Sequence, residues 1–258
     1  MKRTLFLIYG VISYLSFLFT ILYSIGFVGN LIVPKTIDGL PEVSLLQALL
    51  INGGLLTLFA VQHSVMARPA FKEWWTKMIP TEIERSTYVL LSSVCLLILY
   101  WKWEPLGGVV WSIEDGLLTG ILYALFALGW AIVFASSFLI NHFDLFGLRQ
   151  VWLNFTKKPY TSLSFRLPLF YKYVRHPLYF GFLVAFWATP TMTVTHLIFA
   201  IACTGYIVVG ALLEERDLIA HFGDKYRSYK ARVPMLIPFF SKRKTEPQLE
   251  AIQGEAVK

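Results

Sequence analysis

Long uncharged stretches alternate with short polar segments along this sequence. Counted from the N-terminus, the first four stretches span residues 4–29, 43–67, 86–101 and 116–140. An α-helix needs about 20 mostly apolar residues to cross a bilayer. Three stretches exceed that length and residues 86–101 form a shorter one, and each predicts a transmembrane helix.

Two further apolar segments precede the polar C-terminal part. Residues 191–213 are long enough to cross the bilayer, whereas residues 178–189 are too short. Pro190 lies between them and breaks any continuous helix. The pattern therefore predicts an all-α, polytopic membrane bundle. It has five transmembrane helices, a short helical hairpin arm and a cytoplasmic C-terminal helix.

The composition agrees with a membrane protein. The chain is 56% hydrophobic and 15% charged, whereas soluble domains carry about 25% charged residues. Cys95 and Cys203 both lie in apolar runs, which favours free buried thiols over a disulfide. We predict one domain over residues 1–240 and a disordered polar tail at 241–258.

The distribution of Lys and Arg predicts the orientation in the membrane. Of the 23 basic residues, 21 lie in four segments: the N-terminus, residues 68–85, residues 149–175 and the chain after Leu213. Alternating spans put all four segments on one side, which the positive-inside rule makes cytoplasmic. Both termini are then cytoplasmic, and the net charge of +7 indicates topology and not a nucleic-acid partner.

Two polar motifs near the C-terminus carry candidate chemistry. The first is YKYVRHPLYFG at 171–181, and the second is LEERDLIAHFGDKYRSYKARVP at 213–234. Glu214 and Glu215 at the end of a spanning helix oppose the helix dipole, so they need a positive partner. The alternatives without a catalytic role are a lipid-contacting function for Arg175 and an interfacial aromatic belt for Tyr226 and Tyr229.

These motifs resemble the C-terminal signature of the isoprenylcysteine carboxyl methyltransferase superfamily. The resemblance implies S-adenosylmethionine as cofactor, bound near the cytosol, over residues 171–238. The implied cofactor contacts are Tyr173, Val174, Arg175, His176, Pro177, Leu178, Tyr179, Glu214 and Glu215. Arg175 could pair with the cofactor carboxylate, and either glutamate could accept from its ribose or ammonium group.

A third motif, NHFDLFGLRQ at 141–150, resembles bacterial methanethiol S-methyltransferases of the same superfamily. The resemblance implies methylation of a small thiol at the bacterial inner membrane, among membrane lipids. Methanethiol would give dimethyl sulfide, and hydrogen sulfide is a further acceptor. A thiol has a pKa of about 8.5 or higher, so a base must favour its anion. The candidate catalytic residues are Asp144, His142, Asn141 and His63.

Other interpretations stay open at this point. The arginine-histidine-proline motif also occurs in NADPH-dependent sterol-type membrane reductases. The segment from Gln62 to Arg68 resembles a membrane family associated with nitric oxide reduction, which favours a non-enzymatic role. Asn141, His142 and Asp144 could simply cap a helix, and His63 could be a satisfied polar residue between helices. No metal site is expected, because the histidines and cysteines lack ligand-like spacing.

Overall fold

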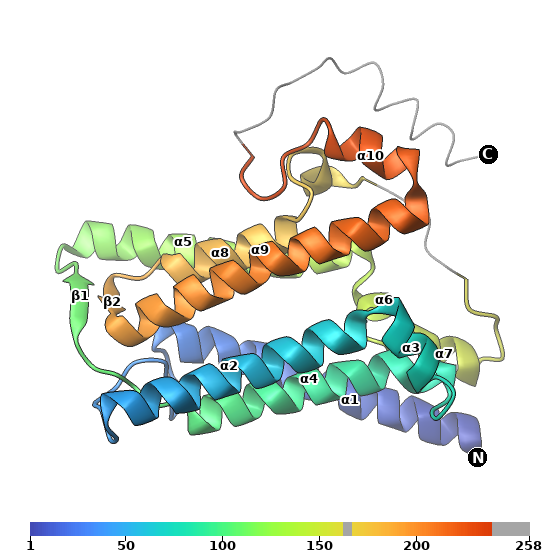
Figure 1. The fold of residues 1–258 in the computed structure, drawn as a ribbon, viewed down its shortest axis with the longest axis horizontal. Coiled ribbons are helices and arrows are strands. Elements are labelled where there is room, and N and C mark those ends of the chain that lie inside the picture. Colours follow the sequence, from blue (N-terminus) through green and yellow to red (C-terminus); the bar gives the residue numbers. More distant parts are fainter. Residues whose placement is uncertain (162–166, 239–258) are drawn as a thin grey trace. The chain divides into compact units, whose positions relative to one another are not determined.

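The computed structural model describes residues 1–161 and 167–238 (Figure 1). The elements are α1 (Lys2–Gly29), α2 (Leu45–Ala67), α3 (Pro69–Trp75), α4 (Thr81–Lys102), β1 (Val109–Ser112), α5 (Gly116–Ile140), α6 (His142–Leu145), α7 (Leu148–Phe155), η1 (Leu169–Lys172), α8 (Pro177–Trp187), β2 (Thr191–Thr193), α9 (Val194–Phe222) and α10 (Asp224–Lys230). The predicted all-α membrane fold is confirmed. The predicted tail at 241–258 lies outside the described residues.

Five of the described helices are long and apolar enough to cross a membrane, as predicted: α1, α2, α4, α5 and α9. The short arm is α8, with 11 residues. Two helix bounds differ from the expectation. Helix α4 begins at Thr81 and not near residue 86, because Glu82 and Glu84 suit the positive N-terminal end of a helix. Helix α9 continues past residue 213 to Phe222, since Gly223, at φ 59°, is the first residue that favours a stop.

The described residues form two compact units. Unit 1 comprises residues 1–123, 142–160 and 189–201, and unit 2 comprises residues 124–141, 161–188 and the chain from 202 onward. Helices α5 and α9 therefore each contribute to both units. The sequence prediction of one domain over residues 1–240 stays a prediction.

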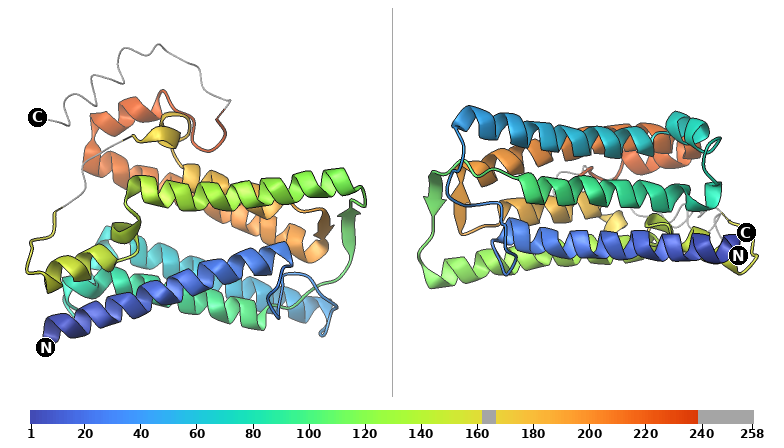
Figure 2. Two further views of the ribbon diagram at one scale, coloured as in Figure 1. Left: turned by 180° about the vertical axis from the view of Figure 1, so that it is seen from behind. Right: turned by 90° about the horizontal axis from the view of Figure 1, so that it is seen from below.

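Unit 1 is built on α1, α2 and α4, which pack side by side in both views of Figure 2. Polar pairs link the apolar helices. Ser24 of α1 lies 2.5 Å from the hydroxyl of Tyr100 on α4. The Asn52 side chain of α2 donates to the carbonyl oxygen of Glu104 at 2.7 Å. Such bonds satisfy polar groups that lipid cannot. They therefore fix how these helices pack.

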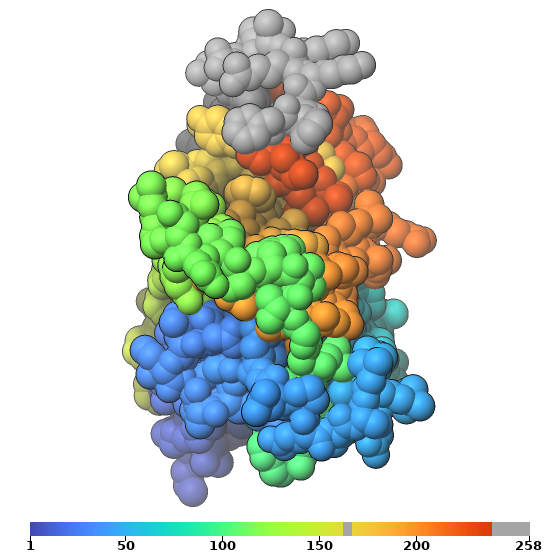
Figure 3. All heavy atoms as spheres, turned by 90° about the vertical axis from the view of Figure 1, so that its left-hand side faces the viewer, coloured from blue at the N-terminus to red at the C-terminus, as the bar shows by residue number. Residues whose placement is uncertain are grey.

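A two-stranded antiparallel ribbon, β1 with β2, is a part of unit 1 that the hydropathy pattern did not predict. Connecting segments of unit 1 gather around it at the face seen in Figure 3. There Thr193 donates a hydrogen bond to Asp38, and the indole of Trp103 donates to the carbonyl oxygen of Ile37 at 3.1 Å. The connection between α1 and α2 is therefore held by specific hydrogen bonds.

Unit 2 depends on a close crossing of α5 and α8. A Cβ atom on Gly129 would lie 2.6 Å from the backbone nitrogen of Ala185, and one on Gly181 would lie 2.7 Å from the carbonyl oxygen of Gly129. Trp130 packs edge-on against Phe182 beside this crossing, with ring centroids 5.7 Å apart. The two glycines therefore allow a backbone approach that any side chain would block.

Replacing Gly181 with leucine is expected to disrupt unit 2, because the new side chain would have to displace the backbone of α5. Overpacking of this kind costs about 1–3 kcal/mol, and more where backbone must move. The measurement is thermal stability of the detergent-solubilised protein by size-exclusion chromatography. Gly205→Leu is the matched control, since a Cβ on Gly205 meets nothing within 4 Å. Equal stability of the two variants would contradict the packing described.

Candidate functional site

A buried carboxylate forms the centre of the polar residues in unit 2. Glu215 of α9 has a side chain only 1% exposed, and two cationic side chains and an imidazole surround it. Its Oε1 lies 2.5 Å from Nε of Arg175 and 3.3 Å from Nε2 of His176. Its Oε2 lies 2.8 Å from Nζ of Lys230. The charge of Glu215 is thus balanced inside the protein.

The chain after α10 closes around the same arginine. The backbone nitrogen of Arg175 donates to the carbonyl oxygen of Pro234 at 2.9 Å, and that of His176 donates to Met235 at 3.1 Å. The Arg175 guanidinium also donates to the carbonyl oxygens of Val233 and Lys230. The two C-terminal motifs, which are far apart in the sequence, therefore fold together through Arg175.

Glu214 has a different environment from its neighbour. Its side chain is 45% exposed, and its Oε2 accepts a hydrogen bond of 2.9 Å from the hydroxyl of Tyr179. Nδ1 of His176 lies 3.6 Å from the same oxygen. The rings of His176 and Tyr179 are stacked, with centroids 5.3 Å apart. Glu214 therefore keeps a solvent-accessible carboxylate beside a fixed aromatic pair.

The remaining predicted cofactor residues also lie in unit 2 and differ in exposure. Tyr173 is 62% exposed, whereas Val174 and Pro177 are buried, and Leu178 is partly buried at the start of α8. Pro177 occupies the first turn of that helix, where proline costs no hydrogen bond. Among these four residues, Tyr173 therefore offers the most open side chain to a ligand.

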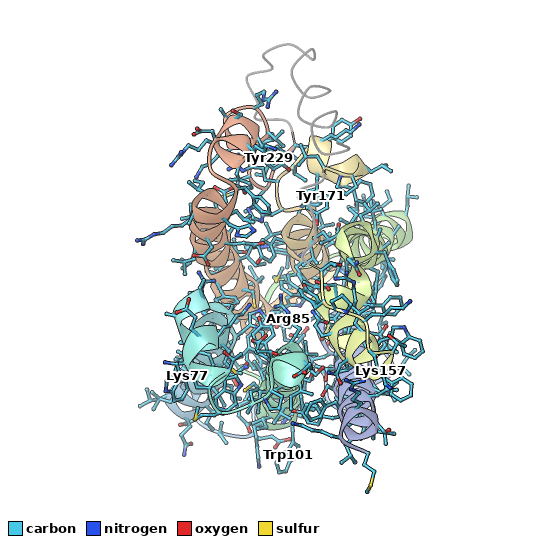
Figure 4. All side chains as sticks on the ribbon, turned by 90° about the vertical axis from the view of Figure 1, so that its right-hand side faces the viewer. Lys77, Arg85, Trp101, Lys157, Tyr171 and Tyr229 are labelled. Carbon is cyan, nitrogen blue, oxygen red and sulfur yellow. The ribbon has the colours of Figure 1, made fainter. Side chains whose placement is uncertain are left out.

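Tyr226 and Tyr229 do not form an exposed interfacial belt, which corrects that alternative. Each is only 2% exposed, and they pack with Leu167 and Val233. The hydroxyl of Tyr229 donates to the carbonyl oxygen of Tyr171 at 2.6 Å, and these two residues lie at the same end of unit 2 in Figure 4. Burial raises the pKa of both phenols. They therefore stay neutral and support the chain behind Arg175.

His142 lies in a tight aromatic surround in unit 1. It is 3% exposed, and its Nε2 is 2.9 Å from the hydroxyl of Tyr14 on α1. Four aromatic rings have centroids 4.9–6.2 Å from the imidazole; they belong to Tyr14, Phe17, Phe143 and Phe146. Burial lowers the pKa of His142 below its ordinary 6.5. The imidazole is therefore neutral at pH 7 and able to accept a proton.

Asp144 of α6 is held by a cation. Its Oδ1 lies 2.7 Å from Nη1 of Arg149, and its Oδ2 accepts from the hydroxyl of Tyr160 at 3.3 Å. The side chain of Gln150 donates to the backbone oxygen of Asp144 at 3.1 Å. Asp144 is therefore engaged through both its carboxylate and its backbone oxygen.

Asn141 and His63 complete the predicted catalytic set. Asn141 ends α5 in unit 2, where its backbone nitrogen donates to the oxygen of Ser137 at 3.2 Å. His63 of α2 lies in unit 1, with Nε2 2.8 Å from the hydroxyl of Tyr88 and Nδ1 3.2 Å from Ser92. These bonds favour the interpretation of His63 as a satisfied polar residue between helices.

The sequence analysis missed partners that the structure provides. Lys230, Tyr14 and Tyr160 are far in sequence from the residues that they contact, so no local spacing indicates them. Arg149 was part of the quoted motif, and its position five residues after Asp144 was the one usable signal. In residues 1–161 and 167–238, no group of three or more His, Cys, Asp or Glu could hold a metal ion.

Comparisons with known proteins extend over nearly the whole chain. It is 55% identical over 243 residues to a methanethiol S-methyltransferase of Crocosphaera subtropica, covering 94% of this chain and 95% of that protein. It is also 55% identical over 239 residues to a methanethiol S-methyltransferase of Mycobacterium tuberculosis, with 93% and 98% covered. Bovine nurim is 28% identical over 187 residues, with 69% and 71% covered. No protein-family model and no solved structure matches the chain.

Proposed function

The chain belongs to the methanethiol S-methyltransferase family, and we propose that it transfers a methyl group from S-adenosylmethionine to methanethiol, giving dimethyl sulfide. Hydrogen sulfide, a smaller thiol of the same chemistry, is the second acceptor that we propose. The observation that carries the proposal is the 55% identity over 94% of the chain to a relative with that name. The names of the relatives favour methyl transfer over the reductase and the non-enzymatic alternatives.

The residues of unit 2 fit a methyl donor that has an ammonium group, a ribose and an adenine. S-adenosylmethionine, when bound, supplies a methyl group on a positively charged sulfur. Glu214 offers an accessible carboxylate for the ammonium or the ribose hydroxyls, and Tyr173 offers an exposed ring. Arg175 is already bonded to Glu215 and to backbone oxygens. We therefore assign a structural role to Arg175, which links Glu215 to the backbone oxygens of Lys230 and Val233.

The residues of unit 1 fit the thiol. His142 is neutral, buried and bonded to Tyr14, so it can take the thiol proton. Asp144, paired with Arg149, keeps α6 and α7 in place around it. The proton leaves the thiol for the imidazole of His142, and the thiolate lone pair would form the new bond to the methyl carbon while the bond from that carbon to the sulfonium sulfur breaks, releasing S-adenosylhomocysteine and dimethyl sulfide.

The protein is a multi-pass membrane protein with five candidate spans in its described part. We propose that it lies in the bacterial inner membrane with both termini cytoplasmic, because Lys and Arg gather in the segments that alternate to one side. The short helix α3 follows α2 and leaves Trp74 52% exposed, as a residue at the lipid headgroups would be.

Glu214→Gln is expected to weaken donor binding while leaving the fold intact. The change removes one charge from a half-exposed carboxylate but keeps its shape and its bond from Tyr179. Loss of one charge-assisted hydrogen bond costs about 1.5–3 kcal/mol, or a 10- to 100-fold rise in KM for S-adenosylmethionine. The measurement is dimethyl sulfide in the headspace by gas chromatography, with purified protein, methanethiol and varied S-adenosylmethionine.

The control is Asp224→Asn, whose carboxylate is exposed and pairs with Arg227 on the surface of α10. It should leave KM for the donor unchanged. Absence of dimethyl sulfide from the wild-type protein would overturn the proposed function itself. Equal KM values for Glu214→Gln and wild type would remove Glu214 from the donor site.

A further inference from the structure

Arg85 lies on α4 next to the residues that we assign to the thiol. Its neighbour Ser86 is fully buried, and the hydroxyl of Ser86 donates to the carbonyl oxygen of Gly147 at 3.3 Å. Gly147, at φ 87°, packs so closely that an added Cβ would lie 2.7 Å from that hydroxyl. This contact fixes the second turn of α4 against the corner between α6 and α7. The position of Arg85 is therefore set by the same corner that carries His142 and Asp144.

The guanidinium of Arg85 has no carboxylate partner within residues 1–161 and 167–238. It is partly buried and lies over the ring of Tyr88, with 5.9 Å between its Cζ and the ring centroid. Glu82, one turn earlier, instead accepts a hydrogen bond of 2.9 Å from Asn154. Figure 4 shows Arg85 on the opposite side of α4 from the exposed Trp101. A partly buried cation of this kind favours an anion beside it.

The charge of Arg85 acts on the polar residues of unit 1. Burial and the Asp144 carboxylate raise the pKa of Tyr160, whereas the positive charges of Arg149 and Arg85 oppose that rise. Tyr88, under the guanidinium, holds the imidazole of His63 through its hydroxyl at 2.8 Å. Arg149 balances the charge of Asp144. Arg85 is thus a second cation near these residues, while the carboxylate of Glu82, one turn earlier on α4, accepts from the neutral amide of Asn154.

Resting on the function proposed above, we propose that Arg85 holds the thiolate form of the acceptor and is a further catalytic residue. When His142 takes the proton, the sulfur becomes negative and needs a nearby cation in a site of low dielectric constant. Arginine stays protonated throughout the working pH range, so it supplies charge without competing for the proton. Its guanidinium lies over the ring of Tyr88, whose hydroxyl contacts the imidazole of His63 in the same unit.

The test compares Arg85→Gln, Arg85→Lys and Lys77→Gln in purified protein. Lys77 is an exposed cation in the same basic segment, so its loss controls for general charge effects. Arg85→Gln is expected to lower kcat/KM for methanethiol about 100-fold, the size of effect seen when one stabilising donor is removed from an anion. Arg85→Lys should recover part of that loss, because lysine keeps the positive charge.

Binding of S-adenosylhomocysteine, measured by calorimetry, distinguishes a thiolate-binding Arg85 from an Arg85 that binds the donor carboxylate. The proposal expects its affinity to be unchanged in Arg85→Gln. Weaker binding with an unchanged thiol dependence would assign Arg85 to the donor carboxylate and overturn the proposal. An active wild type with an equally active Arg85→Gln would also overturn it, without touching the proposed function. In wild-type protein, the anion thiocyanate should compete with methanethiol. Competition with S-adenosylmethionine instead would contradict a thiolate site at Arg85, independently of the results with the variants.

Discussion

Arg175→Met is expected to destabilise the protein severely, by about 3–5 kcal/mol, because it breaks a buried ion pair and leaves Glu215 short of a cation. Glu215 is 1% exposed, so water cannot replace the lost partner. The guanidinium also bonds the carbonyl oxygens of Lys230 and Val233, which lose their donor. We expect a lower yield of monodisperse protein and a lower thermal transition in detergent.

Two further variants test the cause of that loss. Adding Glu215→Gln to Arg175→Met removes the buried charge, and should recover part of the stability. Arg227→Met removes an arginine of similar type from α10, where the ion pair with Asp224 has side chains 61% and 92% exposed. Exposed pairs contribute little, so this control should behave as wild type. A destabilisation of equal size in Arg175→Met and Arg227→Met would refute the role of burial. For activity assays, Glu214→Gln is the cleaner variant.

His142→Gln is expected to lower kcat by about 10²- to 10⁴-fold, the range for loss of a general base. Glutamine keeps a hydrogen-bonding group near Tyr14 but cannot accept the thiol proton. Asp144→Asn should cost less, because its carboxylate is balanced by Arg149 and does not act as the base in our assignment. Both are measured as initial rates of dimethyl sulfide formation. A larger loss in Asp144→Asn would exchange the two roles.

The pH dependence provides a second measurement on the same histidine. Burial lowers the pKa of His142 from its ordinary 6.5, so the neutral, proton-accepting form predominates at pH 6.5 and above. As pH falls through the lowered pKa, the imidazole becomes protonated and kcat/KM for the thiol should fall. In His142→Gln this acid limb should vanish. A limb that persists unchanged would assign it to another group.

Hydropathy was sufficient to predict the spans, because lipid imposes one simple rule on them. The fourth apolar stretch at 116–140 coincides with α5, and α8 is short as expected. The errors occur where a helix continues into polar sequence. Arg85 lies in a helix that the charge pattern began too late, and Glu215 in one that it ended too early. These errors concern the proposed site, because Glu215 is the buried carboxylate of unit 2 and Arg85 is the cation that we propose for the thiolate in unit 1.

The candidate site, too, could be predicted from the sequence only in part. The resemblance indicated which residues gather, and Arg175 indeed lies beside Glu215 and His176. It could not indicate that Glu215 is enclosed while Glu214 is half exposed, because adjacent residues on a helix face different directions. Nor could it supply Tyr14 as the partner of His142, since 128 positions separate them in the chain. Such contacts depend on tertiary packing alone.

The pairing of β1 with β2 has a consequence for how the chain is made. With 11 residues, α8 is about 16 Å long, roughly half the hydrocarbon thickness. The turn that follows pairs its backbone with the β1 region: Ile113 donates to the oxygen of Pro190 at 3.0 Å. Because residues 109–113 leave the ribosome before residues 189–193, the late hairpin finds its hydrogen-bonding partner already synthesised when it enters the membrane.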